Sequence, residues 1–402
     1  MRTFLLAALA ILSSAAQPAM ADAFTYAGHL GTLPVIAEFT GPETGAQQVG
    51  RYAYLSKGID IPLHVIAGGA GLTLREERPC SEALCRKADG ELVTQAPLGA
   101  EWVLTGAVGD QHLSGRWRDP DSGKSLKLKL ELKGRRKVGD SGDAPFDVFS
   151  FYAMASGGEP VASPETLPYD FLRMDTPFER GPETALGDGV IRLDTDPRNG
   201  LDYPVVVRLS GADPAVLNAA LARHRMLSEA PAFACGATAY HGFGWTGSSS
   251  DGSDGFEGNW SVEVKHLSSR LLGWSESGSY FCGGAYPDNF TTEYLVDAKS
   301  GEPVVAEHLL IGWAGDGPSA ALAAYVNQHR DRSDAAREDE CGLPDLVQTN
   351  LGVFFRQHSL VFTLKGLPHV IFACSDDLLE IPLKDARPLL TDAGAAYFAE
   401  FD

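Results

Sequence analysis

The chain has 402 residues, of which 33 are basic and 53 are acidic, so its formal net charge is −20. A surface this acidic repels nucleic acid and anionic lipid, which excludes both classes as expected partners and leaves a cationic partner as the best fit. The 44% share of apolar residues is enough for packed cores, and the length favours two or three domains.

The first residues have the pattern of a secretory signal peptide. Arg2 supplies a positive start, residues 4–12 are apolar, and small residues precede a cleavage site between Ala21 and Asp22. Cleavage would remove Arg2 and take the net charge from −20 to −21. No later run reaches the roughly 18 apolar residues of a membrane span. We therefore predict a periplasmic or secreted protein, with no membrane insertion after signal cleavage.

Six cysteines indicate a disulfide-stapled chain. They are Cys80, Cys85, Cys235, Cys282, Cys341 and Cys374. An even number in an exported protein predicts three disulfides, for which about fifteen pairings are possible. We predict the pairs Cys80–Cys85, Cys235–Cys282 and Cys341–Cys374, because each then lies within one predicted domain. Zinc ligation is the alternative, but the CxxC spacing of zinc sites is missing from the sequence, so we predict no metal site.

Residues 22–133 predict an N-terminal all-β domain, either an antiparallel β sandwich or an open barrel. Short strands alternate with turns, and the last strand has leucine at every second position from Leu126 to Leu132, with charged residues between them. An apolar ligand could lie inside such a barrel, behind aromatic residues. An interior filled by side chains is the commoner case. The aromatic residues in question are Tyr52, Tyr54, Trp102 and Trp117.

A linker is predicted over residues 134–146, where the periodicity stops and glycine, aspartate and serine follow a short basic run. This run, Arg135 to Lys137, adjoins the lysines of the preceding strand in an otherwise acidic chain. It could dock a polyanionic wall polymer. We prefer the simpler interpretation of a solvated strand face that continues into a linker.

Residues 147–402 predict a C-terminal α+β domain with an antiparallel sheet and a few helices. An irregular stretch is predicted for residues 156–189. A helix is predicted to begin at Asp213-Pro214, where Asp213 is an N-cap and proline occupies the first turn. Further helices are predicted at 318–330 and 385–390. The predicted strands are 190–193, 203–209, 260–266, 270–277, 351–355, 360–364, 370–374 and 378–382.

The stretch at residues 279–287 combines aromatic residues, a cysteine, two glycines and a proline. The Gly283-Gly284 pair indicates a backbone that needs positive φ or close approach beside Cys282. Alternatively, the turn presents Tyr280, Phe281 and Tyr286 to a partner as interface anchors. The structural interpretation is the simpler one, and these three aromatic residues are the predicted partner-binding residues.

Three sequence motifs, and their order along the chain, resemble those of a known family. They are Tyr203-Pro204-Val205-Val206 before a helix, Cys282-Gly283-Gly284-Ala285-Tyr286-Pro287 before a strand and turn, and Gly352-Val353-Phe354-Phe355 leading to Ile381-Pro382-Leu383. Residues 190–400 thus resemble the extracellular domain of RsiV-type anti-sigma factors, which also accompanies some peptidoglycan deacetylases. The family's turn has histidine where this chain has Tyr286. The resemblance implies an α+β envelope domain, which in the anti-sigma factors binds lysozyme.

The anti-sigma and deacetylase activities do not carry over, because the sequence shows neither a membrane anchor nor a deacetylase domain. Nucleophile-elbow, zinc-protease and phosphate-loop motifs are missing from the sequence, so it predicts no catalytic residues and no cofactor. The leading hypothesis is a non-enzymatic envelope protein that binds a basic protein such as lysozyme, or peptidoglycan. The alternatives are a cell-wall hydrolase and a carrier of small apolar ligands in the N-terminal domain.

Overall fold

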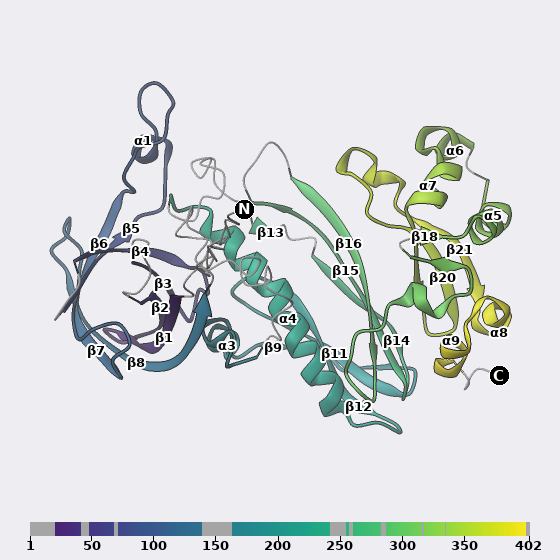
Figure 1. The fold of residues 1–402 in the computed structure, drawn as a ribbon, viewed down its shortest axis with the longest axis horizontal. Helices are drawn as coiled ribbons and strands as arrows, with labels where there is room; N and C mark the ends of the chain where they lie inside the picture. Colours follow the sequence, from purple (N-terminus) through teal and green to yellow (C-terminus); the bar gives the residue numbers. More distant parts are fainter. Residues whose placement is uncertain are drawn as a thin grey trace, which may run out of the picture.

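The computed structural model describes residues 21–41, 48–67, 71–138, 163–241, 255–256, 260–282, 287–315, 317–333 and 335–398. They form an N-terminal barrel, a middle part with a long helix, and a C-terminal part with a small sheet and several helices (Figure 1). The fold is therefore strand-rich and of the predicted α+β class. Apart from Ala21, the predicted signal peptide lies outside the described residues.

The first eight strands close into an antiparallel barrel. Each strand pairs with the next, and the eighth pairs back with the first. The strands are β1 (Ala21–Leu30), β2 (Leu33–Thr40), β3 (Val49–Tyr54), β4 (Ile61–Ala67), β5 (Gly71–Glu77), β6 (Leu98–Thr105), β7 (His112–Arg118) and β8 (Ser125–Val138). β8 continues past Lys133, so Arg135 and Arg136 belong to a strand and not to a linker.

Side chains fill the interior of the barrel. The alternation in β8 directs Leu128 and Leu130 inward, and the rings of Tyr52 and Trp102 pack with their centroids 4.7 Å apart. Glu76 lies beside these rings, and its carboxylate accepts hydrogen bonds from the indole nitrogens of Trp102 and Trp117, both at 2.8 Å. Burial raises the pKa of this carboxyl group. Tyr52 and Trp102 thus belong to a packed core, with Tyr54 and Trp117 against it, which is the side-chain-filled interior expected as the commoner case and not the cavity of the alternative.

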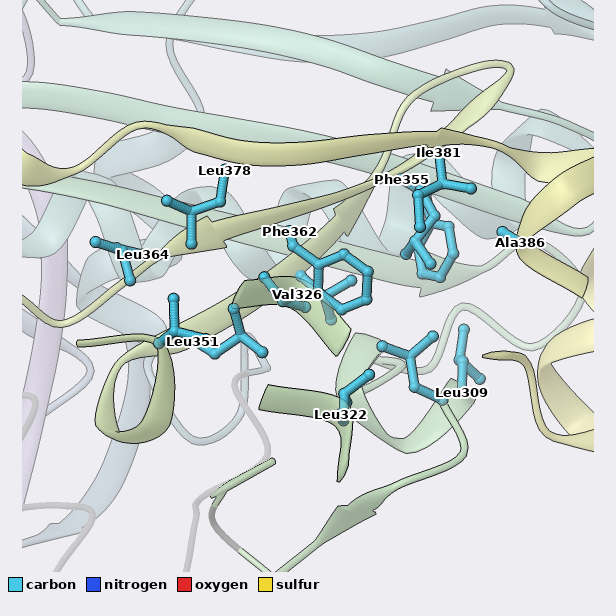
Figure 2. Close-up of a cluster of buried hydrophobic side chains, with 14 of the residues drawn as sticks. Leu309, Leu322, Val326, Leu351, Phe355, Phe362, Leu364, Leu378, Ile381 and Ala386 are labelled. Carbon is cyan, nitrogen blue, oxygen red and sulfur yellow. The ribbon is translucent and has the colours of Figure 1, made fainter. Parts of the chain in front are cut away.

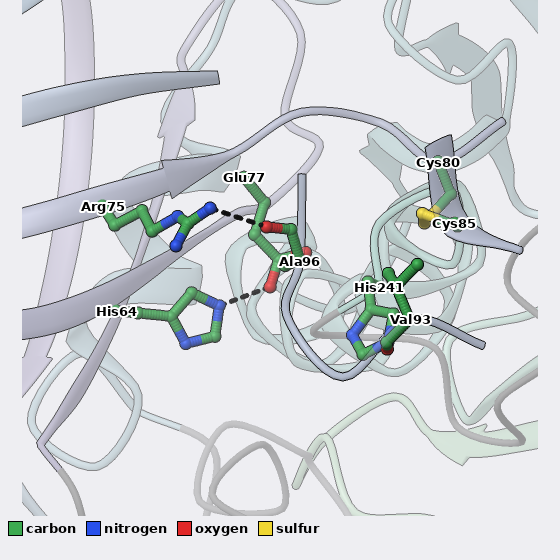
Figure 3. The surroundings of a disulfide bond; sticks show 8 residues. All are labelled: His64, Arg75, Glu77, Cys80, Cys85, Val93, Ala96 and His241. Atoms are coloured by element: carbon green, nitrogen blue, oxygen red, sulfur yellow. Dashed lines mark hydrogen bonds and ion pairs between the residues drawn. A yellow bond between two sulfur atoms is a disulfide. The ribbon is translucent and has the colours of Figure 1, made fainter. Parts of the chain in front are cut away.

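A disulfide-closed segment between β5 and β6 reaches from the barrel to the middle part. It contains α1 (Glu82–Cys85) and the bond between Cys80 and Cys85 (Figure 3). The backbone N–H of Cys80 donates to the carbonyl of Ala239 at 2.7 Å, and Nε2 of His241 lies 3.0 Å from the carbonyl of Val93. The segment thus ties the barrel to the residues that follow the long helix.

Buried ion pairs form a second joint, between the outer wall of the barrel and α3 (Pro168–Met174). Arg51 of β3 binds Glu38 at 2.8 Å and Asp60 at 2.9 Å. Arg173 of α3 binds the other oxygen of Asp60 at 3.3 Å and also pairs with Asp170. The prediction of an irregular stretch at 156–189 was wrong here, because α3 covers the barrel through these long-range partners.

The middle part consists of two sheets and the long helix α4 (Pro214–Ala237). As predicted, Asp213 caps the helix by accepting from the N–H of Ala215 at 2.9 Å, with proline in the first turn. Leu217 and Leu221 of α4 pack in one core with Trp274. The first sheet contains β9 (Glu179–Arg180), β10 (Thr184–Leu186), β11 (Gly189–Thr195) and β12 (Asp202–Leu209). The second contains β13 (Gly255–Phe256), β14 (Ser261–Leu267), β15 (Leu271–Phe281) and β16 (Asp288–Asp297).

The C-terminal part has its own apolar core, in which Val326, Phe355 and Phe362 are fully buried (Figure 2). Its strands are β17 (Trp313–Ala314), β18 (Gly317–Pro318), β19 (Leu351–Phe355), β20 (Ser359–Leu364) and β21 (Asp377–Pro382). Its helices are η3 (Ala306–Leu309), α5 (Ala320–His329), α6 (Ala335–Cys341), α7 (Leu343–Thr349), η4 (His369–Cys374), α8 (Leu383–Ala386), η5 (Arg387–Leu389) and α9 (Asp392–Tyr397). The strand predicted at 370–374 was wrong, because these residues form the 3₁₀ helix η4.

The three disulfides are those predicted from the sequence. Cys80 pairs with Cys85, Cys235 with Cys282, and Cys341 with Cys374. Such bonds form and persist in oxidising compartments. Within the described ranges, none of the helices combines the length and the apolar character that crossing a bilayer requires.

Candidate binding groove

The predicted partner-binding residues lie at the end of β15. Tyr280 and Phe281 are its last residues and both are half-buried, whereas Tyr286 lies outside the described residues. The hydroxyl of Tyr280 donates to a carboxylate oxygen of Asp288 at 3.3 Å, and its ring lies 6.1 Å from that of Phe290. Tyr280 is therefore held against the start of β16, whereas Phe281 pairs with Gly255 of β13.

A groove of about 550 Å³ begins beside these residues and separates the middle part from the C-terminal part. β16 forms one wall, where the groove runs from Asn289 to Leu295, and β19 and β20 form the other, with Phe354 and Leu364. The connection from Val304 to Glu307 closes one side. Pockets of this volume with apolar walls and a few polar groups are typical of sites for small ligands.

A tight turn after β16 fixes the position of this wall. Asp297 accepts from the backbone N–H groups of Lys299 and Ser300 at 2.9 and 2.8 Å. Gly301 has φ of +71°, a conformation that residues with a side chain rarely adopt. The chain then returns along β16, where Val304 donates its N–H to the carbonyl of Leu295 at 2.8 Å.

The opposite wall is formed in part by β19, a strand with apolar side chains on both of its faces. Val353 and Phe355 of β19 point into the C-terminal core, so the alternation of the strand turns Phe354 the other way, toward the groove. The ammonium group of Lys265 lies 3.9 Å from the centre of the Phe354 ring. Such cation–π contacts are worth roughly 0.5–2 kcal/mol, so Lys265 and Phe354 hold each other in place.

Two ion pairs provide the charged groups of the groove. Lys265 binds Glu293 at 3.0 Å, and both side chains are at least 80% buried. Burial raises the pKa of Glu293, while the charge of Lys265 opposes that rise. On the other wall Lys365 pairs with Glu307, and burial lowers the pKa of Lys365. Each pair offers a ligand one cation and one anion beside an apolar surface.

The predicted aromatic residues and the groove meet at Asn289. Its side-chain amide nitrogen lies 3.2 Å from Nδ1 of His369, which begins η4, and the adjacent Asp288 holds Tyr280. Of the predicted residues, Tyr280 therefore lies near one end of the groove without lining it, and Lys265, Glu293 and Lys365 were not among the predicted residues. A useful signal was the unbroken apolar run of β19, because a strand apolar on both faces must be covered on both.

A serine, a histidine and a glutamate also meet, between α4 and β15. Glu276 lies 2.7 Å from Nε2 of His224, and it accepts from the hydroxyl of Ser228 at 3.1 Å and the indole N–H of Trp274 at 3.2 Å. The serine hydroxyl thus donates to the carboxylate, whereas a nucleophilic serine would donate to the histidine. The arrangement satisfies a buried carboxylate and does not activate Ser228.

Among the residues that the structure describes, no three His, Cys, Asp or Glu side chains lie close enough together to hold a metal ion. The lining of the groove itself offers apolar contacts and two ion pairs. In comparisons with known proteins, no family model and no curated protein matches this chain.

Proposed function

We propose that this is a periplasmic or secreted protein of the cell envelope that binds cell-wall fragments, without catalysis, in the groove between β16 and β19–β20. The observation that carries the proposal is the composition of the groove, which is lined by Phe354 and by the two ion pairs Lys265–Glu293 and Glu307–Lys365. Soluble muropeptides combine sugar rings with charged peptide groups, so they would use both the apolar surface and the paired charges.

A basic protein such as lysozyme is the second candidate ligand, and the net charge favours it. Removal of residues 1–21 takes the charge to −21, and complementary charge accelerates association with a cationic protein. The resemblance to RsiV-type domains supports the same candidate. The packed barrel interior gives no support to an apolar-ligand carrier, and the geometry at Ser228 gives none to a hydrolase.

Calorimetry on residues 22–402 tests the proposal, with soluble muropeptides and lysozyme as separate ligands at low and high salt. We expect Lys265→Gln and Lys365→Gln to weaken muropeptide binding about tenfold each, which corresponds to ~1.4 kcal/mol. Lys384→Gln is the matched control, because Lys384 is exposed and lies outside the lining of the groove. It should leave the affinity unchanged.

The two ligands give distinguishable outcomes. Lysozyme binding that falls with salt but ignores both groove variants would assign the function to the acidic surface instead of the groove. Muropeptide binding that is absent, or equal in wild type and groove variants, would overturn the proposed site. Thermal unfolding of each variant checks that a lost affinity does not reflect a lost fold.

A further inference from the structure

The outer face of β7 and β8 carries a cluster of basic side chains, which we call the barrel patch: Arg116, Arg118, Lys127 and Lys129. Their inward neighbours, such as Gly115 and Leu128, face the barrel core, so strand alternation turns the four outward, and all are exposed. Lys127 pairs in register with Arg116, and Lys129 with Ser114. β7 lies at the end of the molecule farthest from the C-terminal part (Figure 1).

None of the four cations of the barrel patch forms an ion pair with a residue in the described part of the chain. Two acidic residues adjoin the patch along the strands: Glu131 pairs with Lys133, and Glu101 is directly cross-strand from Arg118, although the two do not form an ion pair. Other arginines behave differently, since Arg51 and Arg173 are buried in ion pairs with aspartate and glutamate. Arg116 and Lys127, at the centre of the barrel patch, therefore have no ion-pair partner among the described residues, in a chain that has 53 acidic residues and 33 basic ones.

The register adds an energetic argument. Arg116 and Lys127 are directly opposite each other on adjacent strands, and like charges in that position destabilise a sheet. The outward residue across from Arg116 on β6 is Val103, whose exposed fraction is 55%, so this side offers no countercharge. Packing does not require these cations, because their side chains face solvent. A bound anion would remove the repulsion that the fold leaves in place.

We propose that the barrel patch binds a linear polyanion, such as a phosphate-bearing wall polymer. Its cations are separated by roughly 5 Å across the strands and 7 Å along them, which suits closely repeated charges on a single chain. Arginine can hold phosphate through two parallel hydrogen bonds, and lysine adds point charge. A linear polymer fits better than an anionic bilayer, because a bilayer would also meet the acidic remainder of the protein.

Binding of residues 22–402 to long-chain polyphosphate, measured by fluorescence anisotropy at low salt, tests the inference. Arg116→Gln/Lys127→Gln should weaken binding at least about tenfold, and raised salt should weaken wild-type binding strongly. The matched control is Lys299→Gln/Lys384→Gln, which removes the same two charges from exposed positions outside the barrel. It should bind like wild type.

Further measurements separate the possible explanations. The barrel-patch variant should unfold at the same or a higher temperature than wild type, because it loses a repulsive pair. A lower unfolding temperature would indicate a structural role and contradict the inference, as would equal losses in both double variants or no binding by wild type.

Anionic vesicles serve as a competing arm: if they bind more tightly than polyphosphate through the same residues, the ligand is a membrane. The groove variant Lys365→Gln should bind polyphosphate normally, so this site and the proposed function fail independently.

Discussion

Glu229 of α4 is a buried carboxyl group next to a second one, that of Asp196. Burial, together with the neighbouring carboxyl group of Asp196, raises the pKa of Glu229 to about 8, even though the guanidinium groups of Arg225 and Arg198 oppose the rise. These groups lie 4.0 and 3.8 Å from its two oxygens. Neither oxygen accepts a hydrogen bond from the described residues. At neutral pH the native protein therefore holds a proton that the unfolded chain releases.

This proton makes stability depend on pH with a definite sign. Between the unfolded pKa of 4.5 and the folded value of about 8, the native state binds more protons, so the free energy of unfolding falls as pH rises. Glu229→Gln removes the ionisation. We expect the variant to match wild type near pH 5 and to exceed its stability by roughly 2–4 kcal/mol near pH 9, as urea unfolding would show.

Glu263→Gln is the control for this comparison, because Glu263 is exposed on β14. Its unfolding free energy should follow that of wild type at both pH values. If Glu229→Gln were less stable than wild type near pH 9, the carboxylate of Glu229 would be stabilised by its two arginines, and the protonated state would be refuted.

At the scale of elements, the disulfides differ in how much chain they close. Cys235 and Cys282 join the end of α4 to the residue after β15 across a separation of 47 residues, whereas Cys80 and Cys85 are separated by 5. Loop-closure entropy predicts losses of about 4 and about 2 kcal/mol when each bond is removed. We expect the serine double variant at Cys235 and Cys282 to unfold at the lower urea concentration.

The comparison is made without reductant, so that the remaining two disulfides stay intact in each variant. The Cys80/Cys85 double variant serves as the matched control, since it also loses one disulfide. Equal losses, or a larger loss at Cys80/Cys85, would mean that the contacts of α1 with the residues after α4 outweigh the length of the closed chain.

How well the sequence predicted each element depended on how local its determinants are. The leucine alternation of β8 and the Asp213-Pro214 start of α4 are local signals, and both predictions were confirmed. The end of β8 was not predicted, because Arg136 looks like part of a solvated basic run. Its guanidinium is instead buried against Glu38, which is 98 residues away in the chain. That partner cannot be recognised from the residues around Arg136.

The candidate groove shows the same limit. The sequence pointed to Tyr280 and Phe281 through their unusual neighbours, and of the two it is Tyr280 whose ring contacts a residue of the groove, Phe290. Lys265 and Phe354 meet in space but are separated by almost a quarter of the chain, and each is an ordinary residue in an ordinary strand. Only the apolar character of β19 on both faces indicated that something covers Phe354. Sites built between separate sheets leave little trace in the local pattern of either.

At the scale of the whole molecule, a cluster of buried ion pairs joins the barrel to the rest of the chain, beside the apolar contact of Tyr169 with Ile36 and Ala53. Arg173 is the centre of that joint: it pairs with Asp60 of the barrel and with Asp170, and its guanidinium lies 4.9 Å from the ring centre of Phe233 on α4. Removing one partner of a buried pair leaves the other charge uncompensated, which typically costs about 3–5 kcal/mol. Arg173→Ala should therefore weaken the coupling between the barrel and the middle part.

Urea unfolding of Arg173→Ala and wild type, followed by far-UV circular dichroism, tests this coupling. We expect one transition for wild type, and for Arg173→Ala an earlier onset with two separate transitions, because the barrel has its own closed sheet and core. Arg356→Ala is the control: its side chain is 37% exposed and pairs with Asp377 and Glu380 at the surface, so the loss should stay below about 1 kcal/mol per pair. A single unshifted transition for Arg173→Ala would place the coupling instead in the contacts between the α1 segment and the residues after α4.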